Sequence, residues 1–190
     1  MLNWAMVLIC GLCLLCSDEI IVTLYGKQWA EASIYLFILS LMIPLVPNWT
    51  STTALWKALG HVKKIILVTF IEKTLFFLSI AALFHSIKLY AILFVASYFI
   101  ANIIKAIINA RITSMTFYTQ YKEWFIDMTI MVIGVFILSL IHFQSYLIAL
   151  LAKCVLFLTF YFLVSLLFKL NGMRECYREL YILANKLKRC

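Results

Sequence analysis

Long apolar runs separated by short polar breaks dominate the sequence, and this pattern leaves few possible folds. Six runs can be marked out, at about residues 1–16, 30–58, 65–84, 89–110, 124–142 and 146–168. A helix needs about 20 residues to cross a hydrocarbon core of about 30 Å. Backbone polar groups must be paired within lipid, and the runs lack the alternating pattern of barrel strands. The sequence therefore predicts an all-α integral membrane protein, a bundle of about six transmembrane helices with the first one truncated.

The composition agrees with this fold class. Of the 190 residues, 66% are hydrophobic and only 13% are charged, and the mean hydropathy is +1.05. Soluble domains carry about 25% charged residues. A soluble domain is therefore excluded for most of the chain.

Basic residues are unevenly distributed over the breaks, and this sets the expected orientation, because short loops rich in Lys and Arg stay in the cytoplasm. With six antiparallel helices, twelve of the sixteen basic residues fall on one side and two on the other. The C-terminus is then cytoplasmic. The net charge of +8 reflects this topology and attraction to anionic lipid, and we do not expect nucleic acid as a partner. The twelve are Lys57, Lys63, Lys64, Lys105, Arg111, Lys122, Lys169, Arg174, Arg178, Lys186, Lys188 and Arg189.

The first run, "MLNWAMVLICGLCLLC", is short for a full crossing, since its 16 residues would span about 24 Å as a helix. It lacks the basic start and the small-residue cleavage pattern of a signal peptide. We interpret it as the end of a helix whose beginning is missing. Cys10, Cys13 and Cys16 have a spacing seen in metal sites, but no fourth ligand accompanies them. We expect small packing residues there, and neither a metal nor another cofactor.

The second run is longer than a membrane span requires and contains two prolines. As one helix, residues 30–58 would extend about 43 Å. Pro44 and Pro47 each remove a backbone donor and favour a kink, and the polar stretch "NWTSTT" follows at once. The pattern allows two interpretations. One is a kinked helix repaired by its own Ser and Thr hydroxyls, and the other is a hinge beside a polar cavity.

The fourth run places its polar residues on one face. Tyr98, Asn102, Lys105 and Asn109 are 4, 3 and 4 residues apart, which is helical spacing. Such a face is not expected to point at lipid. Either it forms hydrogen bonds with another helix while Lys105 extends to the cytoplasmic surface, or it is one wall of a water-filled cavity that opens inward.

Glu72 and Lys73 lie in the middle of the third run, where a charge facing lipid costs about 2.5 to 3.5 kcal/mol. Neighbouring residues on a helix point about 100° apart, so we expect the two side chains to meet different neighbours. Glu72 is then expected to pair with Lys105 or Lys153. One interpretation of these charges is a buried structural ion pair, or a pair whose members are each neutralised by a shifted pKa.

One stretch resembles a known family. The segment "DEIIVTLYGKQWAEASIYLFILSLMIPLVPNWTSTTALWKALGHVKK" looks like the part of Wzx-type polysaccharide flippases where a helix end is followed by an acidic "E-I-I", a "G-x-x-W-x-x-A" turn and a long helix. These flippases belong to the multidrug/oligosaccharidyl-lipid/polysaccharide exporter superfamily, whose members have two lobes of six helices. The chain is similar to the C-terminal lobe alone. The matching positions are Glu19, Ile20, Ile21, Gly26, Trp29, Ala32 and Gly60.

The resemblance implies transport. The expected function is that of a lobe that flips undecaprenyl-diphosphate-linked oligosaccharide across the bacterial cytoplasmic (inner) membrane by alternating access, in O-antigen and lipopolysaccharide biosynthesis. An N-terminal lobe or a second copy would complete it. In such a transporter Lys73, Lys105 and Lys153 would make the cavity cationic for the diphosphate, and Tyr98 and Asn102 would line it. Glu72 and Asp127 would be candidates for coupling to a proton or sodium gradient, and Pro44 and Pro47 for a hinge.

Two alternatives stay open at this stage. One is a membrane enzyme of surface glycan assembly, such as a polymerase or an acyltransferase, and the other is an inactive or partner-dependent fragment. An enzyme is expected to carry its catalytic groups in a sizeable loop, but no break exceeds about 13 residues and no nucleophile or His-acid arrangement is visible. We therefore expect no enzyme. Residues 170–190 have the stripe of an amphipathic helix and are expected to form a cytoplasmic tail lying on an anionic leaflet.

Overall fold

The computed structural model describes residues 2–113, 116–141, 145–168 and 178, and the expected tail at 170–190 lies outside these residues except for Arg178. The described residues form helices and contain no strand, which confirms the all-α prediction. The elements are α1 (Leu2–Leu15), α2 (Ser17–Tyr25), the 3-10 helix η1 (Lys27–Ala32), α3 (Ser33–Ser40), η2 (Ile43–Leu45), α4 (Val46–Ala58), α5 (Val62–Ile80), η3 (Ala81–Phe84), α6 (Ile87–Thr113), α7 (Phe117–Ser139) and α8 (Tyr146–Leu167).

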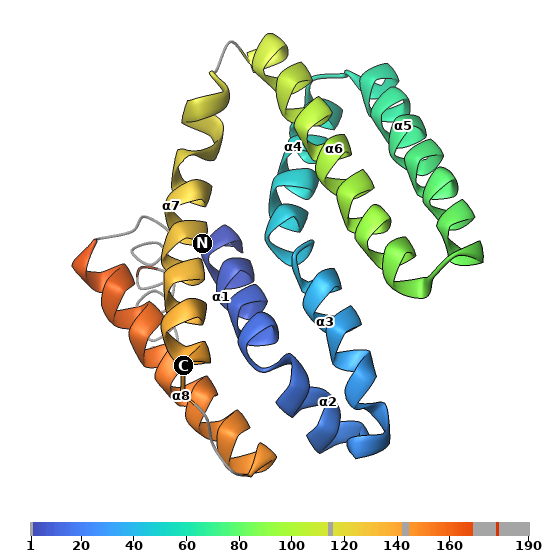
Figure 1. Cartoon of the computed structure of the whole chain (residues 1–190). Helices are drawn as coiled ribbons and strands as arrows, with labels where there is room; N and C mark the ends of the chain where they lie inside the picture. Colours follow the sequence, from blue (N-terminus) through green and yellow to red (C-terminus); the bar gives the residue numbers. More distant parts are fainter. Residues whose placement is uncertain (1, 114–115, 142–144, 169–177, 179–190) are drawn as a thin grey trace, which may run out of the picture.

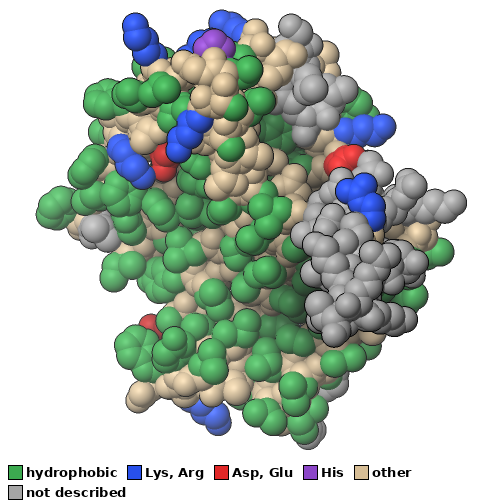
Figure 2. All heavy atoms as spheres, turned by 180° about the vertical axis from the view of Figure 1, so that it is seen from behind, with side chains coloured by type: hydrophobic (Ala, Val, Ile, Leu, Met, Phe, Trp, Pro, Cys, Tyr) green, Lys and Arg blue, Asp and Glu red, His purple; other side chains and the backbone are tan. Residues whose placement is uncertain are grey.

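Three helical stretches in the described part of the chain have the length and composition of a membrane span: Lys27–Ala58, Ile87–Thr113 and Tyr146–Leu167. A fourth candidate is the pair α1 and α2, which are bent by 72° at their junction. The helices α5 and α7 are long enough but contain several charged residues each. Figure 2 shows hydrophobic side chains over most of one face. These features are compatible with a multi-pass membrane protein.

The helices α1, α7 and α8 pack into one group (Figure 1). Its core contains Val7, Cys10, Met131, Phe157 and Tyr161, all buried. Two glycines allow the helices to approach closely, because a Cβ added to Gly11 would lie 2.3 Å from Cζ of Phe157, and one added to Gly134 would lie 2.7 Å from Cε1 of Phe160. In many membrane proteins small residues likewise let two helices approach closely, because van der Waals packing rather than the hydrophobic effect drives helix association in lipid.

The helices α4, α5 and α6 form a second group, in which α5 and α6 make a long antiparallel hairpin (Figure 1). The stretch from η1 to α4 joins the two groups, since α3 packs on α2 and α6 while η2 contacts α1. This connecting stretch is the second apolar run of the sequence. It does not form the single helix that its length suggests.

Two predicted breaks differ from the structure. The first predicted polar break, residues 17–29, instead begins with the helix α2 (Ser17–Tyr25), because Asp18 and Glu19 lie in its first turn, where the helix dipole favours acidic side chains. That helix ends at Gly26, whose φ of 92° suits glycine. The predicted loop 111–123 is short, since α6 continues to Thr113 and α7 begins at Phe117. Its polar residues occupy helix ends, which tolerate them at a membrane surface.

Candidate functional site

The break in the second apolar run is the centre of the candidate site. The helix α3 ends at Ser40, a 3-10 turn follows at Ile43–Leu45, and α4 begins at Val46. Pro44 and Pro47 supply no backbone donor, which accounts for the interruption. The indole N–H of Trp124 on α7 donates a hydrogen bond of 3.0 Å to the carbonyl of Pro44. The predicted kink is therefore present, and a side chain from another helix binds it.

Hydroxyl groups stabilise the first turns after the break. Thr50 donates to the carbonyls of Val46 and Pro47, at 3.1 and 3.0 Å, and Ser51 donates to that of Pro47 at 2.8 Å. Thr53 donates to the carbonyl of Trp49 at 2.7 Å. These hydroxyls bind carbonyls of their own helix, but not those of Ser40 and Ile43, which lie four residues before the two prolines. The repair of the kink by Ser and Thr hydroxyls, and the alternative of a hinge beside a polar cavity, both stay predictions.

A cavity of about 450 Å³ lies beside the break, and we call it the Asp127 pocket. Asp127 on α7 is only 6% exposed, and Glu123, one turn before it on the same helix, also lines the pocket. The amide of Asn3 donates to Oδ1 of Asn48 at 3.2 Å, while Oδ1 of Asn3 and Nδ2 of Asn48 are buried without a hydrogen-bond partner in the described part. The pocket therefore offers an acidic group with amides and hydroxyls around it. Its lining residues are Leu2, Asn3, Trp4, Pro47, Thr50, Ser51, Ala54, Glu123 and Asp127.

Lys105 lies on the other side of α4. It is 3% exposed, and its ammonium donates to the carbonyl of Trp49 at 2.7 Å and to the hydroxyl of Thr53. The same nitrogen lies 3.6 Å from the centre of the Trp49 ring, which is a close cation–π contact. The expectation that Lys105 extends to the cytoplasmic surface is wrong. The backbone carbonyl of Trp49, just after the break, accepts a hydrogen bond from the ammonium, which therefore stays inside the bundle.

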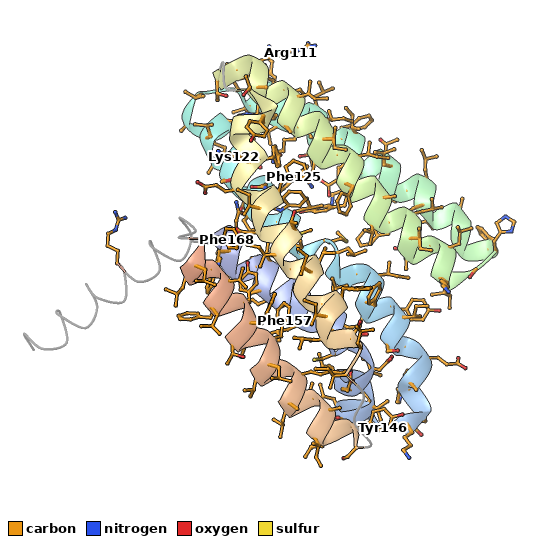
Figure 3. All side chains as sticks on the ribbon, turned by 60° about the vertical axis from the view of Figure 1, so that its left-hand side comes forward. Arg111, Lys122, Phe125, Tyr146, Phe157 and Phe168 are labelled. Atoms are coloured by element: carbon orange, nitrogen blue, oxygen red, sulfur yellow. The ribbon has the colours of Figure 1, made fainter. Side chains whose placement is uncertain are left out.

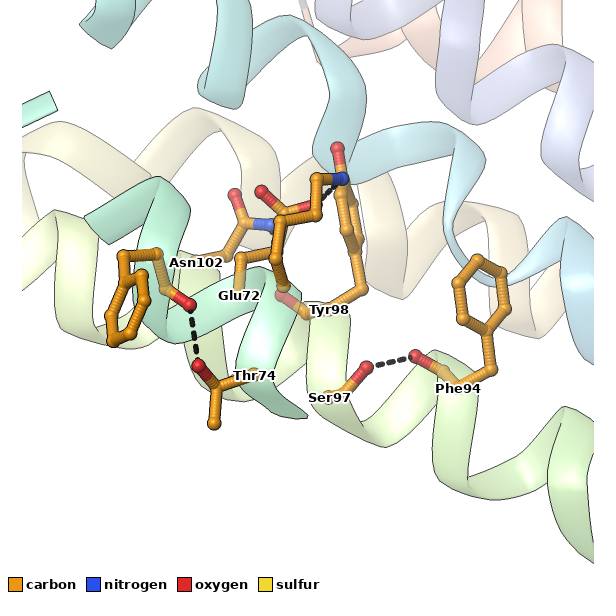
Figure 4. Close-up of polar contacts among 8 residues, drawn as sticks. Glu72, Thr74, Phe94, Ser97, Tyr98 and Asn102 are labelled. Atoms are coloured by element: carbon orange, nitrogen blue, oxygen red, sulfur yellow. Dashed lines mark hydrogen bonds and ion pairs between the residues drawn. The ribbon is translucent and has the colours of Figure 1, made fainter. Parts of the chain in front are cut away.

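The polar face of α6 packs against α4 as a unit. The indole of Trp56 donates to Oδ1 of Asn109 at 2.9 Å, and the rings of Trp49 and Tyr98 lie 5.9 Å apart. Asn102 donates to the carbonyl of Tyr98 on its own helix at 3.0 Å (Figure 4). The prediction of one shared face with hydrogen bonds between helices is confirmed. Whether Tyr98 and Asn102 also line a transport cavity stays a prediction.

Glu72 and Lys73 pair with each other. Their side chains form an ion pair of 3.2 Å, in which Lys73 is 60% exposed and Glu72 is 16% exposed. The expectation of two different ion-pair partners is wrong, because the long Lys73 side chain folds back along α5 to reach its neighbour. The carboxylate of Glu72 also interacts electrostatically with Tyr98, which lies on the facing helix α6 (Figure 4). It interacts in the same way with Lys105.

Lys153 forms an ion pair with Glu19 rather than with Glu72. Both side chains are largely buried, at 14% and 10% exposed, and they join α8 to α2. The three lysines predicted for one cationic cavity thus lie in three places. Lys153 lies between α2 and α8, Lys105 between α4 and α6, and Lys73 on the outer side of α5. Only Lys105 lies beside the break.

Asn3 and Trp124 were missed from the sequence, because a single amide and a single indole carry no spacing signal. Asn48, Trp49 and Thr53 belong to the polar stretch "NWTSTT", but their partners could not be predicted from it. The described residues hold no group of three or more His, Cys, Asp or Glu side chains arranged for a metal ion. Cys10, Cys13 and Cys16 are free thiols within α1 and at its end.

Comparison with known proteins adds no relative: no protein-family model, curated protein or solved structure matches the chain.

Proposed function

We propose that this chain is one lobe of a membrane transporter that works by alternating access, with α5 and α7 crossing the membrane in addition to the candidate spans. The observation that carries the proposal is the broken helix between α3 and α4, on which ionisable groups from two other helices converge. Lys105 binds the backbone just after the break, and Asp127 lies in the pocket beside it. Transporters of several folds place substrate and coupling ions at such interrupted helices.

Asp127 is the residue we assign to ion coupling. A buried carboxylate in a membrane helix is costly unless it is paired or neutralised, so it marks a site where a cation or a proton is taken up. Thr50, Ser51 and Asn3 line the pocket with hydroxyl and amide groups, and the Asn3 amide donates a hydrogen bond to Asn48. Oxygen atoms of this kind are suitable ligands for a sodium ion. Alternatively, the carboxylate of Asp127 can take up a proton and become an uncharged carboxylic acid.

The outer position of Lys73 supports the inference that another lobe or chain packs beside α5. It lies at the middle of α5 with 60% of its side chain exposed, beside the exposed rings of Phe70 and Phe77. A half-exposed ammonium is poorly placed against lipid. We infer that this side of α5 faces a cavity shared with an N-terminal lobe or a second copy of the chain. A lipid-linked oligosaccharide with its diphosphate is the substrate class that the resemblance favours.

A complementation experiment tests the proposal. In a strain of the source organism lacking this gene, surface glycan export should be lost and should return with the natural chain. Asp127→Asn should restore less than about a tenth of the export at equal protein abundance. Asp18→Asn is the matched control, since Asp18 is an exposed acid on α2, and it should restore export fully. Normal export in the deletion strain, or with Asp127→Asn, would overturn the proposal.

A further inference from the structure

A second, larger cavity lies on the outside of the bundle, lined by none of the residues of the Asp127 pocket. It has a volume of about 580 Å³ and runs between α7 and α8; we call it the α7–α8 groove. Its residues on α7 repeat at helical spacing, and so do those contributed by α8 and the residue after it. Both rows face the same channel. The lining residues are Tyr118, Lys122, Phe125, Ile126, Thr129, Ile130, Ile133, Phe160, Val164 and Phe168.

The groove has one polar end. Lys122 is the only charged side chain among its lining residues, and Tyr118 lies one turn before it, so the two share a face of α7. Beyond them the lining is apolar except for Thr129, whose hydroxyl donates to the carbonyl of Phe125 on its own helix. Figure 3 shows Lys122 and Phe125 on neighbouring turns of α7, with Phe168 at the end of α8. A ligand that fits this lining is charged at one end and apolar along the rest.

The length of the apolar part matches one leaflet. From Lys122 to Ile133 the helix rises about 16 Å, and half of a hydrocarbon core of about 30 Å is close to that value. A helix of a partner protein would cover the full core and would leave Lys122 beside apolar surface. A lipid extends from the headgroup region to the membrane centre, as the groove does.

The polar end lies on the side where anionic lipids gather. The turn between α4 and α5 and the connection from α6 to α7 lie at the same end of the bundle (Figure 1). Lys63 and Lys64 follow the first, Arg111 precedes the second, and Lys122 follows it. By the bias of basic residues this end is cytoplasmic, and the cytoplasmic leaflet carries the negative surface potential.

We propose that the α7–α8 groove binds an anionic phospholipid of the cytoplasmic leaflet. The ammonium of Lys122 and the hydroxyl of Tyr118 hold its phosphate, and one acyl chain lies along Ile126, Ile133 and Phe160. This site requires that the chain spans a membrane, but it does not require transport. An experiment that disproves the lipid site would therefore leave the transporter proposal standing, and loss of the transporter proposal would leave the lipid site standing.

Lipid binding by the purified full-length chain tests the site. The number of lipids retained and their dissociation constants are measured by native mass spectrometry with dioleoyl phosphatidylglycerol and, separately, with dioleoyl phosphatidylcholine. Phosphatidylglycerol should bind about tenfold more tightly, because both phosphates can accept from Lys122 but the choline ammonium of phosphatidylcholine offsets the negative charge of its phosphate and is repelled by the lysine. Lys122→Gln should make the two lipids equal, and Ile133→Trp should weaken both by filling the groove. Lys122 and Ile133 are exposed, so both variants should fold.

Matched controls come from α6. Lys88→Gln removes an exposed basic residue near the opposite end of the bundle, and Ile92→Trp adds an indole to another exposed apolar position. Neither should change the preference for phosphatidylglycerol. Equal binding of both lipids by the natural chain, or an unchanged preference in Lys122→Gln, would overturn the proposal. So would crosslinking of Ile133→Cys to another protein chain in native membranes, because the groove would then be a protein interface.

Discussion

Lys153 on α8 and Glu19 on α2 form an ion pair with both side chains largely buried, 134 residues apart in sequence. The pair fixes the position of α2 after the 72° bend that separates it from α1. Glu19 belongs to the sequence stretch that resembles the flippase turn, and Lys153 was expected to line a cavity. In the structure both residues hold two helices together.

The first prediction follows from the burial of this ion pair. Lys153→Gln leaves the carboxylate of Glu19 buried without its counter-charge, so the free energy of unfolding should fall by about 3 to 5 kcal/mol. Glu19→Gln should have a similar effect. The double variant Glu19→Leu with Lys153→Met should recover most of the loss, because no isolated charge remains. Pulse proteolysis of the purified variants measures the change, and equal stability of Lys153→Gln and the natural chain would contradict it.

The second prediction concerns the close approach of α1 to α8. A Cβ at position 11 would lie 2.3 Å from the Phe157 ring and 2.8 Å from Cγ of Met131. Gly11→Ala should therefore destabilise the chain by about 1 to 3 kcal/mol, the usual effect of overpacking. Phe157→Leu provides the control, because a smaller side chain makes room. The double variant should lose less than the sum of the two single variants, as expected for residues in contact. Strict additivity would show that the two positions do not touch.

The third prediction tests the orientation. A cysteine at Ser86, in the exposed turn before α6, should react with a membrane-impermeant thiol reagent in intact cells. A cysteine at Lys122 should react only after the membrane is permeabilised. Of the six natural cysteines, Cys176 and Cys190 are first replaced by Ser. The other four, Cys10, Cys13, Cys16 and Cys154, lie within helices or at their ends and should react slowly in both conditions. The opposite labelling pattern would invert the orientation and remove the leaflet argument for the α7–α8 groove.

The sequence allowed the local features to be predicted more accurately than the long-range ones. The spacing of Tyr98, Asn102, Lys105 and Asn109 correctly predicts one face of α6, because helical periodicity is a local property. The two prolines correctly predict the break for the same reason. Charge partners were mostly assigned wrongly, since any of several acids and lysines can meet in a bundle and only packing decides which do. The Asp127 pocket combines residues of α1, α4 and α7, so no spacing rule reveals it.

The last prediction concerns Lys73. Its ion pair with Glu72 joins adjacent residues and leaves most of the Lys73 side chain exposed, which is the arrangement in which a pair contributes least to stability, about 0 to 1 kcal/mol. Glu72 also keeps its interaction with Lys105 when Lys73 is replaced. Lys73→Gln should therefore leave abundance nearly unchanged, whereas Lys153→Gln should lower it. If Lys73 attracts a passing diphosphate, glycan export should fall sharply at that unchanged abundance.

Two further variants separate charge from packing at this position. Lys73→Arg should recover part of the export because it keeps the charge, although a planar guanidinium does not reproduce the shape of an ammonium. The double variant Glu72→Gln with Lys73→Gln should be abundant and inactive. If Lys73 serves only to neutralise Glu72, the double variant should instead export normally. Abundance measured beside export in all four proteins distinguishes these outcomes, and normal export by an abundant Lys73→Gln protein would exclude a transport role for this residue.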